Sequence, residues 1–395
     1  MKKTLKDYDF NNKRVLVRVD FNVPLKDGVI TNDKRIVESL PTIKYIIENG
    51  GSVVLMSHLG RPKGKYNPEM SLEPVSKRLS ELLDKEVKFF ADENVISESV
   101  QEDILSLKSG DVALLENTRF VAGEEKNDEA FAKELAKNFD IYVNDAFGTS
   151  HRAHASNVGV SKFLPSAIGF LIEKEVKYIE SSIENPKRPF VAILGGAKVS
   201  DKIGVIENLL QKVDKIIIVG AMAFTFLKSQ DISVGKSLVE NDKLDEAKKI
   251  LKMADEKNVR IILPIDFVVA EEIKEDAAAA IVPAMNIPSN LEGLDIGPMS
   301  AKLIEMELKD AKTVIWNGPA GVFEIPTFAN GTFAIAKTLA SLDDCITIIG
   351  GGDSASAIEK AGVADKITHI STGGGASLEM LEGKVLPGID CIMDK

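Results

Sequence analysis

The chain has 395 residues, of which 44% are hydrophobic and 28% charged, a composition typical of globular proteins and unlike that of disordered or fibrous ones. Its formal net charge of −11 excludes a globally basic surface for nucleic acid or an anionic membrane, so any anionic ligand must be bound by locally clustered cations. This length exceeds what one hydrophobic core usually supports and predicts two domains.

Two further features indicate a cytoplasmic protein. The N-terminal stretch MKKTLKDYDF lacks the apolar segment of a secretion signal, and no run is long and apolar enough to span a membrane. Cys345 and Cys391 allow at most one disulfide and have no metal-binding spacing, as expected in a reducing compartment. We therefore expect no nucleic-acid partner and no membrane partner.

The first half alternates short β-branched runs with helical patterns, as βαβ units and parallel sheets do. We predict strands at residues 14–21, 52–58, 87–90, 111–117 and 141–147. Helical patterns lie around residues 33–49, 71–84 and 127–139. Ligands bind beyond the carboxyl ends of the strands in such sheets, so the residues after each strand are the candidate site.

The residues at these positions form a basic cluster. They are Asp20, Asn22, Arg35, His58, Arg61, Arg119, His151, Arg152 and His154. Guanidinium groups bind phosphate and carboxylate through paired hydrogen bonds, so the four arginines suit a small molecule that carries both groups. Each arginine taken alone could be an ordinary surface residue, but their shared placement after strands favours an anion site.

The stretch SHRAHAS holds two of the four histidines of the chain. The H-x-x-H spacing of His151 and His154 can bind zinc, but no further Cys or His ligand lies nearby in the sequence. A solvated loop is a plainer alternative. With Arg152 between the histidines, we interpret the stretch as one wall of the basic pocket.

A connecting helix is predicted between the two halves. Apolar residues spaced for one helix face occur at Val176, Ile179 and Ile183, and the pattern stops at Pro186 and Pro189. We expect a first domain over residues 1–170, a connecting helix and hinge over 171–189, and a second domain over 190–395. The C-terminal tail is expected to pack back on the first domain.

The second half repeats the alternation of strands and helices. We predict strands at residues 190–196, 215–221, 260–266, 313–318, 346–351 and 367–372. Six such strands predict a second doubly wound parallel sheet. Residues 277–298 contain three prolines and are expected to form an irregular excursion.

The segments after the strands of this half are rich in glycine, whereas those of the first half carry arginine. They are LGGAKVSDKI, VGAMAFTF, NGPAGVFE, IGGGDSASAI and STGGGASLEM. Glycine lets the backbone approach phosphates, and helix N-termini present unpaired N–H groups, so these segments predict nucleotide binding. Lys198 and Lys202 are expected one helical turn apart, where both reach one phosphate chain. Asp353 can bind Mg²⁺ together with nucleotide phosphates, or it can cap a helix.

Two other functions fit the pattern less well. The stretch GGGDSA matches the G-x-G-x-x-A of dinucleotide sites, but no acidic residue ends the next strand to hold a ribose, which argues against an NAD(P)-linked dehydrogenase. None of the glycine segments is a Walker A sequence, G-x-x-x-x-G-K-S/T. A protein that merely binds a phosphorylated metabolite leaves Lys198, Lys202 and Asp353 unexplained.

Eight motifs between residues 18 and 357 resemble, in order, those of phosphoglycerate kinases: RVDFNVP, SHLGRPKG, ENTRF, DAFGTSHRAHAS, GGAKVSDKI, LDIGP, NGPAGVFE and GGGDSASA. The resemblance implies an α/β fold of two doubly wound parallel-sheet (Rossmann-like) domains joined by a helical hinge. It also implies a monomeric, cytoplasmic kinase of glycolysis. Such an enzyme transfers a phosphoryl group reversibly between 1,3-bisphosphoglycerate and ADP, giving 3-phosphoglycerate and MgATP.

The resemblance also implies roles for individual residues. The glycerate substrate is assigned to Asp20, Asn22, Arg35, His58, Leu59, Gly60, Arg61, Arg119, Arg152 and His154. The nucleotide is assigned to Lys198, Lys202, Gly293, Glu324, Gly351, Gly352, Asp353 and Ser354, with Mg²⁺ on Asp353. Catalytic roles go to Arg35, Lys198, Gly374 and Gly375, the two glycines offering backbone amides to the moving phosphoryl group.

One position departs from the family pattern. Ala320, in NGPAGVFE, stands where the resemblance leads us to expect methionine. The difference affects local packing near the nucleotide and removes no charged group. We expect direct in-line transfer, without a phosphoenzyme, when the connecting helix bends and the domains close.

Overall fold

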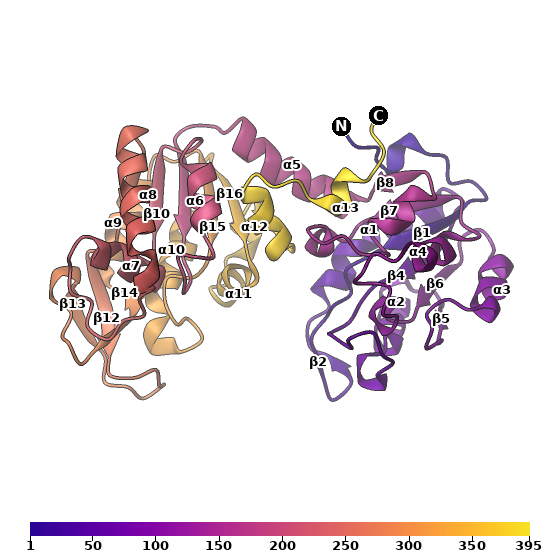
Figure 1. Cartoon of the computed structure of the whole chain (residues 1–395), viewed down its shortest axis with the longest axis horizontal. Coiled ribbons are helices and arrows are strands. Elements are labelled where there is room, and N and C mark those ends of the chain that lie inside the picture. The colour runs from indigo at the N-terminus through magenta and orange to yellow at the C-terminus, as the bar shows by residue number, and fades with distance from the viewer. The chain divides into compact units, whose positions relative to one another are not determined.

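The computed structural model describes all 395 residues, which form two compact α/β units (Figure 1). Unit 1 comprises Met1–Lys177 and Val385–Lys395, and unit 2 comprises Tyr178–Lys384. Helix α5 (Phe170–Glu184) contains the first boundary between the units. The second boundary falls between Lys384 and Val385, so the chain passes between the units twice.

Unit 1 is built on a six-stranded parallel sheet of order β5-β6-β4-β1-β7-β8. Its strands are β1 (Arg14–Arg18), β4 (Ser52–Met56), β5 (Val87–Phe90), β6 (Val112–Leu115), β7 (Ile141–Asn144) and β8 (Ser166–Ile168). Strands β4, β6 and β7 are buried throughout, as expected when helices cover both faces of a parallel sheet. The five predicted strands are confirmed, and β8 is added.

The other elements of unit 1 are helices and one short hairpin. They are α1 (Lys34–Glu48), α2 (Glu73–Leu83), α3 (Glu98–Ser106), α4 (Glu129–Ala136), α13 (Pro387–Asp390), β2 (Leu25–Lys26) and β3 (Val29–Ile30). The amphipathic pattern of α1 buries Ile36, Ile43 and Ile46 against the core. The core of this unit also contains Val15, Val17 and other side chains of the central strands.

The last residues of the chain belong to unit 1. The Gly388 N–H donates to the Ser150 carbonyl oxygen at 2.8 Å, and Asn144 Nδ2 donates to the Gly388 carbonyl oxygen at 2.6 Å. Lys2 and Asp394 form an antiparallel β-bridge. The first and last segments of the sequence are therefore held together in one unit.

Unit 2 contains a second six-stranded parallel sheet, of order β11-β10-β9-β15-β16-β17. Its strands are β9 (Phe190–Leu194), β10 (Lys215–Ile218), β11 (Arg260–Ile262), β15 (Thr313–Asn317), β16 (Ile346–Gly350) and β17 (His369–Ile370). The fold class expected from the sequence is confirmed. Its central strands β9 and β15 are buried throughout, and Trp316 is a fully buried side chain of the core.

Unit 2 also contains seven α-helices. They are α6 (Ile203–Leu209), α7 (Met222–Ser229), α8 (Leu244–Glu256), α9 (Pro298–Leu308), α10 (Asn330–Ala340), α11 (Gly352–Lys360) and α12 (Gly375–Leu381). No helix of the chain combines the length and the apolar character that crossing a membrane requires.

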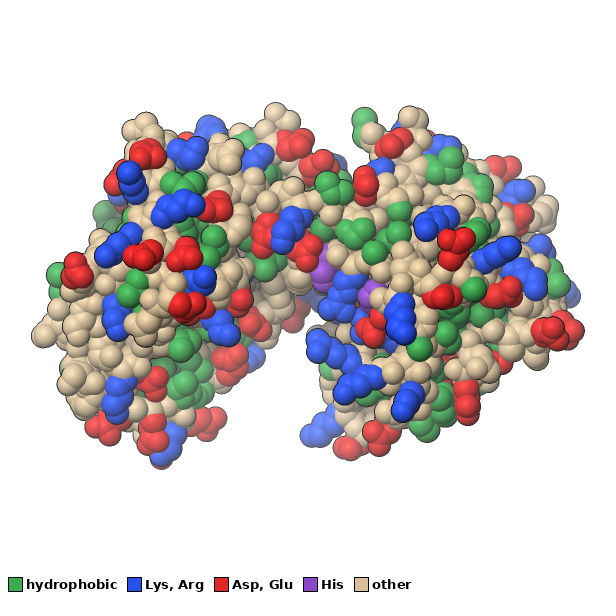
Figure 2. Space-filling model, in the orientation of Figure 1, with side chains coloured by type: hydrophobic (Ala, Val, Ile, Leu, Met, Phe, Trp, Pro, Cys, Tyr) green, Lys and Arg blue, Asp and Glu red, His purple; other side chains and the backbone are tan.

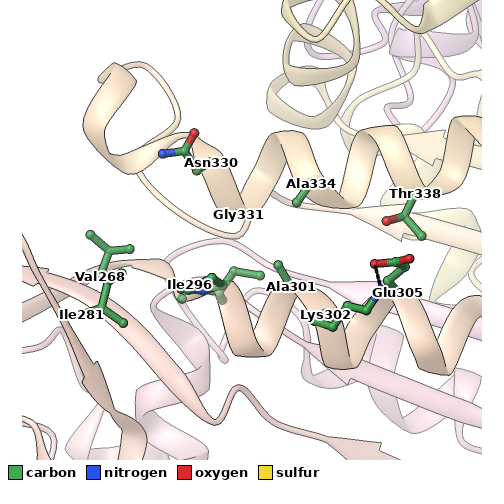
Figure 3. A pocket seen from close by; sticks show the side chains of 12 residues that line it. Val268, Ile281, Ile296, Ala301, Lys302, Glu305, Asn330, Gly331, Ala334 and Thr338 are labelled. Carbon is green, nitrogen blue, oxygen red and sulfur yellow. Dashed lines mark hydrogen bonds and ion pairs between the residues drawn. The ribbon is translucent and has the colours of Figure 1, made fainter.

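The expectation of an irregular excursion over residues 277–298 is wrong in part, because the stretch contains two strands. They belong to a three-stranded antiparallel sheet of order β13-β12-β14, made of β12 (Asp266–Ala270), β13 (Ala280–Pro283) and β14 (Glu292–Ile296). Figure 3 labels Ile281 of β13 and Ile296 of β14. Asp266, expected at the end of a parallel strand, instead begins β12. The edge strand β13 is mostly exposed, so it lacks the buried pattern by which strands are recognised in a sequence.

Candidate functional site

In unit 1, Arg35 is held in place by the segment that follows β1. Its Nη1 donates to Asp20 Oδ2 at 3.0 Å and to the Asn22 carbonyl oxygen at 3.2 Å. Asn22 Oδ1 in turn accepts from the Gly60 N–H at 2.9 Å. The Arg35 side chain is 36% exposed, so its guanidinium is oriented by Asp20 and is still accessible to a ligand.

Arg119 is buried with unused donors. It is 3% exposed, and its Nη1 donates to the Gly60 carbonyl oxygen at 2.9 Å. Its Nε lies 3.2 Å from Glu125 Oε1 without hydrogen-bond geometry, and its buried Nη2 has no hydrogen-bond partner. Buried N–H groups are nearly always paired, so an unsatisfied guanidinium indicates a site for an anion.

The two histidines of the predicted site lie among the arginines. Burial first, and then Arg18, Arg119 and Arg35, hold the pKa of His58 well below its usual value. Burial, Arg18 and Arg119 lower the pKa of His154 to about 4. Both rings are therefore neutral at pH 7, and the positive charge of the site resides on guanidinium groups.

Figure 2 shows Lys and Arg side chains gathered on the surface of unit 1.

The structure adds Arg18, which the sequence analysis did not place in the site. Arg18 ends β1 and is 1% exposed. Its Nη2 lies 3.3 Å from His58 Nδ1, and its Nε donates to Ser156 Oγ at 2.7 Å. Arg18 stands inside a predicted strand, where a site residue is not expected. The one sequence signal for it is its two-residue spacing from Asp20, because residues two apart in an extended chain lie on the same side.

The remaining predicted residues of unit 1 differ in exposure. Arg61 and Arg152 are exposed, and Arg152 Nε lies 3.3 Å from His151 Nε2. Leu59 is buried, and its carbonyl oxygen accepts from Asn117 Nδ2 at 2.7 Å, which fixes the loop that carries His58 and Gly60.

The structure bears on both alternatives for the histidine stretch. No group of three or more His, Cys, Asp or Glu side chains is arranged to hold a metal ion, so the zinc interpretation has no further ligands. The stretch is solvated only in part: Arg152 and Ala153 are exposed, whereas His154 is only 7% exposed. It belongs to the buried wall of the basic cluster.

In unit 2, glycines at the carboxyl ends of β9 and β15 bring two backbone segments together. A Cβ atom on Gly195 would lie 2.3 Å from the Pro319 carbonyl oxygen, and one on Gly318 would lie 2.2 Å from the Gly195 carbonyl oxygen. The Gly195 N–H donates to the Asn317 carbonyl oxygen at 2.9 Å. Only glycine permits the two backbone segments to come this close. The strand ends therefore expose backbone atoms and no side chains at these positions.

The two predicted lysines do not lie on one helical turn, and this expectation is corrected. Helix α6 begins at Ile203, Lys202 is its N-cap residue, and Lys198 lies in the preceding loop. Lys202 is 9% exposed and donates to Asn317 Oδ1, whereas Lys198 is exposed. The lysines therefore have different environments at the carboxyl end of β9.

The stretch GGGDSA forms the start of α11. Gly351 is the N-cap residue and the helix begins at Gly352, so Asp353 lies inside the first turn and is not the cap. Asp353 is exposed, while Ser354 is buried and its Oγ accepts from the Gly318 N–H at 2.7 Å. A single exposed carboxylate fits Mg²⁺ held mainly by nucleotide phosphates.

The other residues assigned to the nucleotide are spread over several elements. Gly293 lies in β14, where its N–H donates to Ser237 Oγ at 2.9 Å, and Glu324 is exposed on the loop after β15. Gly374 is the N-cap residue of α12, and Gly375 begins that helix. Ala320 is buried, and its N–H donates to Thr332 Oγ1 at 3.0 Å.

Comparison with known proteins shows similarity over the whole chain. Residues 5–384 match the family model described as phosphoglycerate kinase. The phosphoglycerate kinase of Finegoldia magna is 60% identical over 394 residues, covering 100% of each chain, and that of Clostridium tetani is 57% identical, covering 100% of this chain and 98% of the other. The solved structure of phosphoglycerate kinase from Coxiella burnetii has a TM-score of 0.89 at 44% identity, covering 99% of this chain and 98% of that one.

Proposed function

The chain belongs to the phosphoglycerate kinase family, and on this premise we propose that its two strand-end sites each bind one substrate of a single phosphoryl transfer. The glycolytic reaction of this family interconverts 1,3-bisphosphoglycerate and ADP with 3-phosphoglycerate and ATP, and this chain catalyses it. The observation that best supports the assignment of the glycerate to unit 1 is the buried Arg119 guanidinium with an unpaired N–H among other arginines.

We propose that the basic cluster of unit 1 binds the phosphorylated glycerate. Arg61, Arg119 and Arg152 suit the substrate's own phosphate, because guanidinium groups bind phosphate bidentately. Arg35 suits the acyl end, where the phosphoryl group is transferred. The residues that would orient these arginines or complete the pocket are Asp20, Asn22, His58, Leu59, Gly60 and His154.

The glycine-rich edge of unit 2 would bind the nucleotide. Lys202 and Lys198 would meet the phosphate chain, and Gly351, Gly352 and Ser354 would shape the backbone beside it. Gly293 and Glu324 would bind the nucleoside. Gly374 and Gly375 would present backbone amides to the moving phosphoryl group.

Catalysis would rest on positioning and on charge neutralisation, because phosphoryl transfer asks for little covalent help from the protein. We expect direct in-line transfer without a phosphoenzyme. Asp353 would hold Mg²⁺, which neutralises phosphate charge when bound with the nucleotide. We also propose that the enzyme works as a monomer in the cytoplasm.

A coupled assay tests the function directly. Phosphoryl transfer should require 3-phosphoglycerate, ATP and Mg²⁺ together, and omission of any one should abolish turnover. Turnover without 3-phosphoglycerate, or none with all three present, would contradict the assignment.

Nucleotide affinity should depend on pH through Lys202. Burial lowers its pKa to about 8, an effect partly offset by Asp201, Glu382 and Asp353. A bound phosphate chain favours the charged form, so binding takes up a proton once the pH exceeds about 8. We expect the ADP Kd to rise by up to about tenfold per pH unit above that value.

Calorimetric titration of ADP between pH 7 and 9.5, in buffers of different ionisation enthalpy, measures both the Kd and the proton uptake. The Lys202→Arg variant is the control, because arginine keeps its charge over this range. A wild-type Kd that stays constant to pH 9.5 would rule out Lys202 as the titrating group.

Both substrates together should make the molecule more compact. Donor and acceptor atoms must come within about 3 to 3.5 Å for transfer, and the substrates are assigned to separate units, so we propose that the units close about α5. Small-angle X-ray scattering with 3-phosphoglycerate and an unreactive ATP analogue should give a smaller radius of gyration than the free protein. Equal radii would contradict closure.

A further inference from the structure

Glu124 is a fully buried carboxylate below the basic cluster of unit 1, in the loop that follows Arg119. Its Oε1 accepts from Thr118 Oγ1 at 3.2 Å and also from Ser156 Oγ, while its Oε2 accepts from the Ser156 N–H at 2.9 Å. Its backbone carbonyl oxygen accepts from the Ala155 N–H at 2.9 Å. The residue therefore joins two loops that are separate in the sequence.

Each bonded segment carries a member of the basic cluster. Thr118 directly precedes Arg119, and Ser156 closely follows Arg152 and His154. His154 Nδ1 lies 3.9 Å from Glu124 Oε1. One carboxylate thus holds the positions of the cations on both loops.

The connection extends to a third segment through Ser156. The Ser156 hydroxyl donates to Glu124 and accepts from Arg18 Nε at 2.7 Å. Arg18 Nη2 lies 3.3 Å from His58 Nδ1. The chain of contacts from Glu124 to Arg18 therefore lies within the buried interior of the site.

Burial of a charge is unfavourable unless it is compensated, and hydrogen bonds to both carboxylate oxygens supply that compensation for Glu124. It is fully buried beneath the cluster, and both carboxylate oxygens already accept hydrogen bonds from the protein. A substrate phosphate would also be repelled by it. Glu124 is therefore suited to hold the binding groups and not to contact the ligand.

We propose that Glu124 is a positioning residue of the glycerate site, which fixes Arg119, His154 and Arg18 as a preformed set for a phosphate group. This rests on the assignment of the phosphorylated glycerate to unit 1. Preformed guanidinium groups bind phosphate without being reordered, so loss of Glu124 should weaken substrate binding more than turnover.

The direction in which 3-phosphoglycerate affinity changes on loss of Glu124 distinguishes a positioning role from a purely electrostatic one. Removal of a nearby negative charge would, by Coulomb attraction alone, make the site bind anions more tightly. Loss of the bonds that position the arginines would make it bind them more weakly. Glu124→Gln removes the charge and keeps the shape, so it decides between the two.

We expect Glu124→Gln to raise both the Kd and the KM for 3-phosphoglycerate roughly tenfold, with kcat and the KM for ATP within about twofold of wild type. Ser156→Ala, which removes only the hydroxyl between Glu124 and Arg18, should change the same constants in the same direction. Calorimetry with 3-phosphoglycerate and steady-state kinetics supply these values, and thermal melts show whether each variant is folded.

Glu116→Gln is the matched control. Glu116 is 3% exposed and accepts from Ser71 Oγ, the Leu72 N–H and the Asn117 N–H at 2.7, 2.9 and 2.8 Å. Unlike Glu124, it has no bond to Ser156, the residue that connects to Arg18. Its loss should reduce stability while leaving the 3-phosphoglycerate Kd unchanged. An equal rise in Kd in this control would mean that general loosening of the loops explains the result, and would overturn the proposal.

Unchanged or tighter 3-phosphoglycerate binding in Glu124→Gln, or a loss confined to kcat, would also overturn it. If Glu124→Gln does not fold, Ser156→Ala decides: a normal Kd there contradicts the proposal. Failure of the wild-type protein to bind 3-phosphoglycerate would refute the substrate assignment itself, so the two failures are distinguishable.

Discussion

Arg35→Ala should lower kcat roughly 10³-fold while raising the KM for 3-phosphoglycerate far less. Arg35 is oriented by Asp20 at 3.0 Å and by the Asn22 carbonyl oxygen at 3.2 Å, yet keeps an exposed guanidinium. In the proposed arrangement it meets charge that develops on the moving phosphoryl group. An interaction made only in the transition state affects kcat and not ground-state binding.

Two variants test the geometry behind this prediction. Arg152→Ala should show the opposite balance, with the larger effect on KM, because an exposed arginine at the substrate's own phosphate acts in the ground state. Arg35→Lys should restore only part of the activity, since it keeps the charge but loses the planar fork. Steady-state kinetics decide both, and a near-normal kcat in Arg35→Ala would show that this residue is wrongly placed.

Lys202→Ala should raise the ADP Kd about 10²-fold and leave the affinity for 3-phosphoglycerate almost unchanged. Lys202 is 9% exposed and is aimed by Asn317 Oδ1, so its ammonium group is already partly desolvated and oriented before a phosphate arrives. The two ligands are assigned to different units, so the effects should separate. Calorimetric titration with each ligand measures them.

Lys215→Ala is the matched control in the same unit. Lys215 is 16% exposed and pairs with Glu307 at 3.0 Å, but it lies at the amino end of β10, away from the strand ends where the nucleotide is expected. Its loss should leave both affinities unchanged. A comparable loss of 3-phosphoglycerate binding in Lys202→Ala would contradict the division of the ligands.

Buried parallel strands were the most predictable part of the fold. Strands such as β4 and β15 lie between layers of helices, and every residue in them is buried, so each contains an uninterrupted apolar run, VVLM in β4 and VIW in β15. The antiparallel sheet could not be predicted in this way. Its edge strand β13 exposes Ile281 at 60% and ends at Pro283, and neither feature resembles a buried strand.

The candidate site could be predicted where a residue follows a strand, as with His58 and Arg119. Arg18 and Glu124 were not recognised, because Arg18 stands inside a predicted strand and Glu124 in the charged run GEEKND, which resembles a solvated loop. Their burial depends on contacts with Ser156, more than a hundred positions away for Arg18. The predicted helical spacing of Lys198 and Lys202 was wrong for a related reason. The glycine-rich backbone after β9 packs closely against another segment, and α6 begins only at Ile203.

The return of Val385–Lys395 to unit 1 makes unit 2 an insertion within the sequence of the other unit. During synthesis from the N-terminus, all of Tyr178–Lys384 is made before the last residues of unit 1. Until those residues are made, Asn144 and Ser150 lack their partner Gly388. Unit 1 therefore cannot complete its folding in the order of the sequence, and its N-terminal residues reach their final state only after the C-terminus is free.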